Sequence, residues 1–439
     1  MSTLGVAGIA FVGMLALIAI RMPIALAMLA TGSLGYIYLA GWGTFLNYMK
    51  STPYYLFSNY TLSVIPLFIL MGAFAERSGL ARDLFAAARA LIGHMRGGLA
   101  YAVIAACTVF GAICGSSVAT TATFGRAALP ELRRYNYDGG FATGTIAIGG
   151  VVDLMIPPSI ILVVYAIVTE QNIAKLFQAA LIPGLMAVSF YCIVIFLVVR
   201  FRPHLAPTQP KMDRPERVRS VIAVWPALLV ILLVIGGIYS GIFTPTEAAA
   251  VGTVAMLAVG LLQRSLSFED FKLSFLQTAE TSAMIFAILL GAEVFDAFLA
   301  LSQMPQKAAE LVASSGLSPY GIMFALMIFY ILLGAVMDEL AMMLLTLPVF
   351  FPIVTALDFG MPPDEVGIWF GILMLTVVGI GLTAPPIGLN VFVVSSIAKD
   401  VPITRTYAGV LPYIGADIVR LTICVLFPSI TLVLVRWLN

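Results

Sequence analysis

The stretch Gly111-Ala-Ile-Cys-Gly-Ser-Ser-Val-Ala-Thr-Thr-Ala-Thr123 is small, rich in hydroxyl groups and interrupted by glycine, and it lies between two apolar runs. These runs, about 99–113 and 118–129, are each shorter than the roughly 20 apolar residues that cross a bilayer. Non-helical backbone at membrane depth is tolerated only where protein or a water-filled cavity satisfies its polar groups. The stretch therefore favours a re-entrant hairpin whose tip, residues 114–117, faces a site. Close helix packing through small residues is the alternative interpretation.

The composition indicates a membrane protein. Of the 439 residues, 61% are hydrophobic and 10% are charged, whereas a soluble domain has about 25% charged residues. The net charge of +1 argues against a nucleic-acid partner. All four cysteines lie in apolar runs, so we interpret them as small buried side chains and not as a disulfide framework. The sequence thus predicts an all-α polytopic membrane protein that contacts the lipid bilayer.

Residues 1–199 predict a first half with five spans. Two consecutive prolines, Pro157 and Pro158, remove two amide donors and must break the helix around them in mid-membrane. Charges at helical spacing predict an amphipathic surface helix, and a polar, aromatic stretch predicts a loop. The expected elements are spans at about 4–20, 24–39 and 62–75, the loop 41–60, the surface helix 80–92, the hairpin 98–130, the broken helix 141–168 and the span 176–199.

Residues 200–220 form a polar linker between two apolar halves. This linker carries six basic residues against two acidic ones, so the positive-inside rule places it in the cytoplasm. Residues 221–439 then repeat the pattern of the first half. The expected elements are spans at about 227–239, 245–262 and 278–300, a surface helix at 303–313, a hairpin at 319–353 around Met337-Asp338-Glu339, and a broken helix at 366–398.

The two halves keep nearly the same register. Gly334-Ala335 corresponds to Gly111-Ala112, and Pro385-Pro386 corresponds to Pro157-Pro158, at offsets that differ by a few residues. Each half contains an odd number of spans, so the second half must cross the membrane upside down relative to the first. The sequence therefore predicts an inverted-topology repeat of about ten spans, two re-entrant hairpins and two Pro-Pro-broken helices, with both termini on the periplasmic side. Such repeats are typical of secondary transporters.

Four motifs, in this order, resemble those of the large membrane subunit of tripartite ATP-independent periplasmic (TRAP) transporters. They are Gly115-Ser-Ser-Val-Ala-Thr120, Ile156-Pro-Pro-Ser159, Phe243-Thr-Pro-Thr-Glu-Ala-Ala249 and Thr383-Ala-Pro-Pro-Ile-Gly-Leu-Asn390. The resemblance implies sodium-coupled uptake, across a bacterial inner membrane, of a carboxylate-bearing solute such as a C4-dicarboxylate or sialic acid. It also implies an elevator movement of the hairpin-containing domain and two partners, a small four-span membrane subunit and a periplasmic solute-binding protein.

The resemblance further implies Na⁺ as the coupling ion and no other cofactor. Carbonyl and hydroxyl oxygens at hairpin tips and helix breaks suit a sodium ion without a dense carboxylate cluster. We expect one site between the first tip and the second break and another between the second tip and the first break, although the pairing could instead lie within each repeat. The predicted sodium ligands are Gly115, Ser116, Ser117, Asp153, Pro157, Gly334, Asp338, Thr383, Pro385 and Gly388.

An anionic substrate would meet the N-termini of half-helices, whose amides point toward it. Arg126 and Asp153 are unusual, because a charge at the bilayer centre costs about 2.5 to 3.5 kcal/mol on insertion scales and usually faces a partner or a cavity. We expect Arg126 to contact the substrate carboxylate or to pair with Asp153; alternatively, it extends to cytoplasmic water. Asn390 could instead cap a helix. The predicted substrate-binding residues are Arg126, Ser117, Thr120, Ser159, Thr383 and Asn390.

Other classes of membrane protein fit the sequence less well. An intramembrane protease needs a Ser-His dyad, a metal motif or paired aspartates, but His94 and His204 fall on the predicted surface helix and in the linker, and no His-Glu-x-x-His motif occurs. We therefore predict no enzyme activity. Broken helices in an inverted repeat favour alternating access over a channel. The nearest alternative is a stand-alone ion-coupled organic anion transporter or antiporter without a binding protein.

Overall fold

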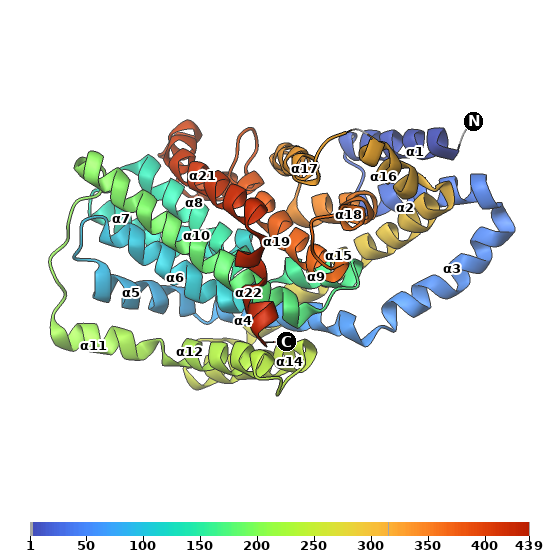
Figure 1. Ribbon diagram of the computed structural model, residues 1–439. Coiled ribbons are helices and arrows are strands. Elements are labelled where there is room, and N and C mark those ends of the chain that lie inside the picture. Colours follow the sequence, from blue (N-terminus) through green and yellow to red (C-terminus); the bar gives the residue numbers. More distant parts are fainter. Residues whose placement is uncertain (1–2, 315, 439) are drawn as a thin grey trace.

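The computed structural model describes residues 3–314 and 316–438, and every regular element within them is a helix (Figure 1). Residues 1, 2, 315 and 439, which the predicted halves 1–199 and 221–439 include, lie outside these ranges. The first half contains α1 (Thr3–Ala19), α2 (Ile24–Ala40), α3 (Trp42–Phe57), η1 (Tyr60–Ser63), α4 (Val64–Arg77), α5 (Leu80–Ile92), α6 (Gly98–Cys114), α7 (Ser117–Arg134), α8 (Gly139–Met155), α9 (Ile160–Val168) and α10 (Ile173–Phe201).

The second half follows a short helical turn, η2 (Pro203–Leu205), and the irregular residues up to 213. Its helices are α11 (Arg214–Ala223), α12 (Trp225–Ile231), η3 (Leu232–Gly236), α13 (Gly237–Tyr239), α14 (Pro245–Leu262), α15 (Phe268–Ser302), α16 (Met304–Ser314), α17 (Pro319–Gly334), α18 (Glu339–Ala356), α19 (Pro363–Gly381), α20 (Leu389–Ile397), α21 (Ile403–Leu426) and α22 (Pro428–Leu438).

Length and composition support a polytopic membrane protein with slightly fewer spans than expected. Within the described ranges, eight helices are long and apolar enough to cross a bilayer, or nine if α8 and α9, which are bent by 42°, form one broken span. The number of spans predicted from the sequence, about ten, differs from this count for two reasons. Helices α1 and α2 have only 17 residues each, whereas α18, expected as one arm of a hairpin, has 18 residues and is apolar enough to span.

The loop predicted at 41–60 is wrong, because most of it forms α3. Aromatic side chains recur at helical spacing in this segment, and Phe45 and Tyr48 both pack against Tyr36 of α2, with ring centroids 5.7 and 5.1 Å away. Tyr54 and Tyr55 remain exposed. Helix α3 is therefore an amphipathic element, and its polarity had obscured its periodicity. The second part of the predicted linker is also helical, since α11 begins at Arg214.

Local chemistry explains the turn of each hairpin. Gly115 ends α6 with φ +65°, in the left-handed region that favours glycine, and the Ser116 side chain then caps α7 by accepting from the Ala119 amide. Between α17 and α18, the Asp338 carboxylate accepts from the amides of Leu340 and Ala341 at 3.2 and 3.5 Å. Both hairpin tips thus end in an N-cap that satisfies the first amides of the returning helix.

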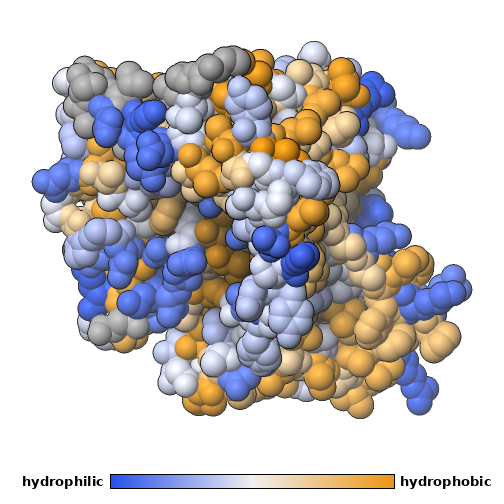
Figure 2. Space-filling view, turned by 90° about the vertical axis from the view of Figure 1, so that its right-hand side faces the viewer, coloured by the Kyte–Doolittle hydropathy of each residue, from blue (hydrophilic) through white to orange (hydrophobic). Residues whose placement is uncertain are grey.

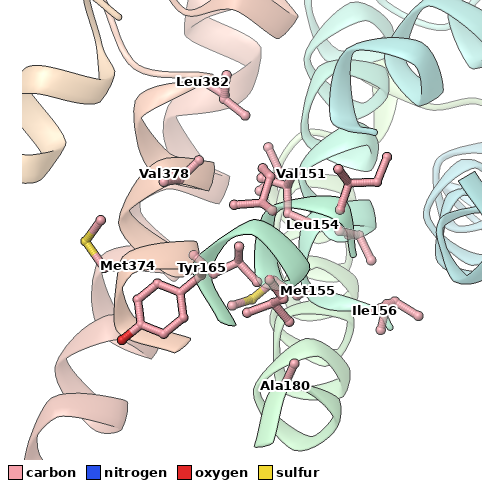
Figure 3. Packing of buried hydrophobic residues seen from close by; sticks show 14 of the residues in the cluster. Val151, Leu154, Met155, Ile156, Tyr165, Ala180, Met374, Val378 and Leu382 are labelled. Atoms are coloured by element: carbon pink, nitrogen blue, oxygen red, sulfur yellow. The ribbon is translucent and has the colours of Figure 1, made fainter. Parts of the chain in front are cut away.

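The two helix breaks follow the Pro-Pro pairs. Residues 156–159 separate α8 from α9, and residues 382–388 separate α19 from α20. Both Pro-Pro peptide bonds are cis. Figure 3 shows the packing beside the first break, where Val151 of α8 faces Val378 of α19 and Tyr165 of α9 lies beside Met374. All four side chains are at most 2% exposed. Because lipid tails are as apolar as these side chains, this contact stabilises mainly through van der Waals packing.

Charged and apolar parts of the molecule lie in different places. Residues 202–213 run down the left edge of Figure 1 and join α10 to α11, whereas α1 lies at the opposite end. Figure 2 views that opposite end and shows apolar side chains over much of its right-hand side, with polar side chains gathered on the left. Leu232 of η3 and Val254 and Leu262 of α14 are each more than half exposed. Apolar surface of this extent is typical of contact with lipid.

A buried ionic cluster, which the sequence analysis did not anticipate, ties α21 to α10. Asp417 and Arg420 are both fully buried, and the Arg420 Nη2 to Asp417 Oδ1 distance is 2.8 Å. The Tyr191 hydroxyl donates to Asp417 Oδ2 at 2.6 Å. Arg420 Nη1 also donates to the Pro183 carbonyl and contacts the Met155 sulfur at the end of α8. The cluster therefore joins three helices directly beside the first break.

We expect Arg420→Met to lower the free energy of unfolding by about 3–5 kcal/mol, because it leaves the buried Asp417 carboxylate without its cation. Arg436→Met is the matched control, since Arg436 pairs with Glu365 while 45% exposed and such pairs contribute at most about 1 kcal/mol. Denaturant titration of the purified variants in detergent micelles measures both values. Equal losses in the two variants would contradict the assigned role of the cluster.

Candidate functional site

The two hairpin tips meet through one hydrogen bond. Ser117, the first residue of α7, donates from its hydroxyl to Glu339 Oε2 at 3.1 Å. Glu339 is the first residue of α18 and lies 222 positions further along the chain. Both side chains are buried. Ser117 and Asp338 are predicted site residues, whereas Glu339 was placed in the second tip without a role, although an acidic residue inside an apolar hairpin is by itself a sign of function.

Asp153 lies behind the first tip. Its side chain is fully buried, and Oδ2 accepts from the Thr120 hydroxyl at 2.6 Å. Oδ1 has no hydrogen-bond partner among the residues that the structure describes. Gly111 of α6 makes room for this carboxylate, because a Cβ there would come within 2.6 Å of Oδ1. The predicted sodium ligand Asp153 and the predicted substrate ligand Thr120 thus contact each other.

Arg126 does not pair with Asp153, as one of its predicted roles required. Instead, Arg126 Nη2 lies 3.2 Å from Glu76 Oε1, and the arginine side chain is 64% exposed. The physical reason is the position of Arg126 on α7, nine residues after Ser117 and therefore about 13 Å along the helix from the tip. At that distance the guanidinium can reach the surface and a carboxylate at the end of α4.

Polar groups from two helices, α7 and α20, converge on Gly150 of α8. A Cβ at Gly150 would lie within 3.2 Å of the Ser117 carbonyl oxygen, the Thr121 hydroxyl and the Asn390 side-chain amide. Asn390 Nδ2 donates to the Ala147 carbonyl at 3.3 Å. In the described part of the chain, Asn390 Oδ1 and Thr121 Oγ1 are buried without hydrogen-bond partners. Oxygens of this kind suit a hard cation. We call the residues Ser117, Thr121, Gly150 and Asn390 the Gly150 cluster.

Contacts of tips with breaks occur within each repeat and, across the two repeats, between the first tip and the second break. The Gly150 cluster joins the first tip to the second break through Asn390. Within the first repeat, a Cβ at Gly115 would contact the Pro158 carbonyl at 3.0 Å. Within the second repeat, the Ile387 amide donates to the Ala335 carbonyl at 3.3 Å. Tips and breaks from both halves therefore pack as one unit.

The remaining predicted site residues have varied surroundings. Ser159 is buried, and its hydroxyl has no partner within residues 3–314 and 316–438. The Thr383 hydroxyl, in the second break, donates to the carbonyls of Gly379 and Ile380 at the end of α19. Gly334 packs against Gly381, where a Cβ would meet backbone, and Gly388 starts α20 with φ +55°. Pro157 and Pro385 lie in the two breaks.

A small cavity separates the hairpin tips from helices α4 and α15. Its volume is about 100 Å³, enough for an ion or a few water molecules. Its polar lining includes Ser116, Glu339, Glu76 of α4, and Gln277 and Thr281 of α15. Gln277 also accepts from Arg77 at 2.7 Å. The cavity thus leaves a polar-lined space between the tips and helices α4 and α15.

Comparisons with known proteins show which proteins the chain resembles. A family model described as "Tripartite ATP-independent periplasmic transporter, DctM component" matches residues 11–430. The chain is 37% identical over 382 residues to the C4-dicarboxylate TRAP transporter large permease protein DctM of Pseudomonas aeruginosa, covering 87% of each chain. It is 30% identical over 423 residues to the sialic acid TRAP transporter large permease protein SiaM of Vibrio cholerae, covering 96% of each.

A third relative and a solved structure extend the comparison. The ectoine TRAP transporter large permease protein TeaC of Halomonas elongata is 34% identical over 379 residues, which cover 85% of this chain and 86% of TeaC. The crystal structure of the YdaH transporter of Alcanivorax borkumensis aligns with a TM-score of 0.60, over 88% of this chain and 89% of that one. At 14% identity, the similarity to the YdaH structure concerns the fold alone.

We expect Gly150→Ala to lower the free energy of unfolding by about 1–3 kcal/mol, because the new methyl group overpacks the Gly150 cluster against the Ser117 backbone. Gly13→Ala on α1 is the matched control, since no atom lies within 4 Å of its added Cβ. This control should leave stability unchanged or raise it by up to about 1 kcal/mol. Thermal unfolding in detergent compares the two, and a neutral Gly150→Ala would contradict the close approach of α7 and α8.

Proposed function

The chain belongs to the DctM family, the large membrane component of TRAP transporters, and on that premise we propose that it imports a carboxylate-bearing organic solute by sodium-coupled secondary transport. It is a transporter permease and not an enzyme. DctM and SiaM relatives are named for C4-dicarboxylates and sialic acid, and both are organic acids. The N-termini of α7, α18 and α20 offer partial positive charge near the tips and breaks to such an anion.

The Gly150 cluster is the observation that carries the proposed sodium coupling. It combines a backbone carbonyl, a hydroxyl and a side-chain amide from two discontinuous helix regions, and unwound carbonyls at such places coordinate Na⁺ in other secondary transporters. In this proposal Ser117, Thr121 and Asn390 ligate one ion. Thr121 was not among the predicted site residues, and Asn390 was predicted to bind substrate and not sodium. The predicted substrate ligand Thr120 instead donates its hydroxyl to Asp153.

The proposed mechanism is an elevator movement in an inverted-repeat fold. Supporting it, the hairpin α6–α7 packs with the broken helices α8–α9 and α19–α20, while α2 packs against α15 and α4 against α14. The first group would form the moving domain and the second the scaffold. The arginine-bearing residues 202–213 and the N-terminal helix lie at opposite ends (Figure 1), as expected for a cytoplasmic linker and a periplasmic N-terminus in a bacterial inner membrane.

The proposal includes two partners that TRAP systems generally have, a small four-span membrane subunit and a periplasmic solute-binding protein. The alternative is a stand-alone ion-coupled organic anion transporter. Uptake of labelled carboxylates into proteoliposomes that contain this chain and the small subunit distinguishes them. We expect uptake that needs both an inward sodium gradient and the binding protein. Uptake without the binding protein would favour the alternative, and uptake without sodium would reject sodium coupling.

Thr121→Ala should raise the sodium concentration for half-maximal uptake by about tenfold or more, because it removes one ion-ligating oxygen, and a bond to a charge contributes about 1.5–3 kcal/mol. Thr108→Ala on α6 is the matched control, since its hydroxyl only donates to the Ile104 carbonyl one turn earlier. Sodium titration of initial uptake rates at fixed substrate measures the shift. An equal shift in both variants would contradict the assignment of Thr121.

A further inference from the structure

The largest of the described cavities lies away from the hairpin tips. It is a groove of about 520 Å³ between the start of α8, the end of α10 and the start of α21. Its walls are mainly apolar and include Phe141, Leu197 and Pro412. Its floor is formed where α8 and α21 approach closely, since a Cβ at Gly409 would collide with the Gly140 carbonyl. An apolar groove thus remains between helices that are in close contact at its floor.

The mouth of the groove carries two arginines. Arg405 Nη2 lies 3.1 Å from Asp138 Oδ2, and the arginine side chain is 62% exposed. Arg202 also lines the groove, and in the part of the chain that the structure describes, its side chain has no ion pair or hydrogen bond. With Asp138 neutralising one of them, the mouth keeps a net positive charge.

The groove runs from these charges into an apolar region. From Arg405 to Pro412 the lining extends along about 10 Å of α21. Phe201 and Leu197, at its edge on α10, are 79% and 44% exposed. A cationic mouth above apolar walls complements a molecule with an anionic head and a hydrocarbon tail. A free anion would use only the mouth, and an uncharged apolar molecule would use only the walls.

We propose that this groove binds an anionic phospholipid, with its phosphate between Arg202 and Arg405 and part of an acyl chain between α10 and α21. Arg202 at the mouth belongs to residues 200–220, the basic segment that the positive-inside rule places in the cytoplasm, where anionic lipids concentrate. Basic pockets between membrane helices on that side bind such headgroups. The inference does not depend on the proposed solute or coupling ion.

Lipid binding to the purified full chain with its small subunit, in an uncharged detergent, tests the proposal. Native mass spectrometry would titrate phosphatidylglycerol and phosphatidylcholine, and we expect phosphatidylglycerol to bind more tightly. An arginine near a lipid surface contributes about 1 kcal/mol, or about fivefold in affinity. The double variant Arg202→Gln, Arg405→Gln should therefore bind phosphatidylglycerol about 30-fold more weakly. Both side chains are exposed, so this variant keeps the buried core intact.

The matched control removes two arginines from the neighbouring helix α11. Arg214→Gln with Arg219→Gln lowers the charge equally but leaves the groove unchanged, and should keep wild-type affinity. Ala408→Phe keeps both groove arginines and fills the groove that Ala408 lines, so it should weaken phosphatidylglycerol binding by at least tenfold. Equal losses in the α11 control, full binding by Ala408→Phe, or competition by glycerol phosphate at the lipid's own concentration would each overturn the proposal.

Discussion

The close approach of helix backbones to α8 is the constraint on which the rest of the structure depends. Gly144 contacts Gly409 of α21, Gly149 contacts Cys107 of α6, and Gly150 contacts α7. Helices in a bilayer gain little from the hydrophobic effect, so small residues that allow close packing and polar contacts must hold them together. Because α8 is packed on several sides in this way, its broken end is held beside both hairpin tips. The position of the site follows from the packing of this one helix.

Polar contacts between the two halves reinforce this arrangement. Thr143 meets Thr406 at 2.9 Å, Thr145 meets the Tyr413 hydroxyl at 3.0 Å, and Ser117 meets Glu339. All these groups are buried, where an unpaired hydroxyl or carboxyl costs about 1–3 kcal/mol or more. Each contact therefore favours one register of α7 and α8 against α18 and α21. The Gly150 cluster differs, because it retains oxygens without partners, and a site for an ion requires such oxygens.

Features set by local chemistry could be predicted from the sequence, and features set by helix rotation could not. Gly115 and the Pro-Pro pairs act on their own backbone, so the turns and breaks were placed from single motifs. Which side chains face one another between the two halves depends on how each helix is rotated about its axis. Helices that are apolar on every side, such as α8 and α19, have no hydrophobic periodicity from which this rotation could be predicted. For this reason Thr121 was not singled out, the role of Arg126 was left open between the substrate, Asp153 and water, and the Asp417–Arg420 cluster was missed.

The contacts between the halves also bear on how the protein is made. The partner of Thr145 on α8 is Tyr413, 268 residues later in the chain. At about 5–20 residues per second, a ribosome needs roughly 15–50 s to synthesise that distance. During this interval the hydroxyls of Ser117 and Thr145 lack their later partners from α18 and α21. The backbone at Gly144 and Gly150 likewise lacks its later neighbours from α21 and α20. Until the second half is synthesised, these polar groups of the first half remain without their partners, either in the translocon or beside lipid.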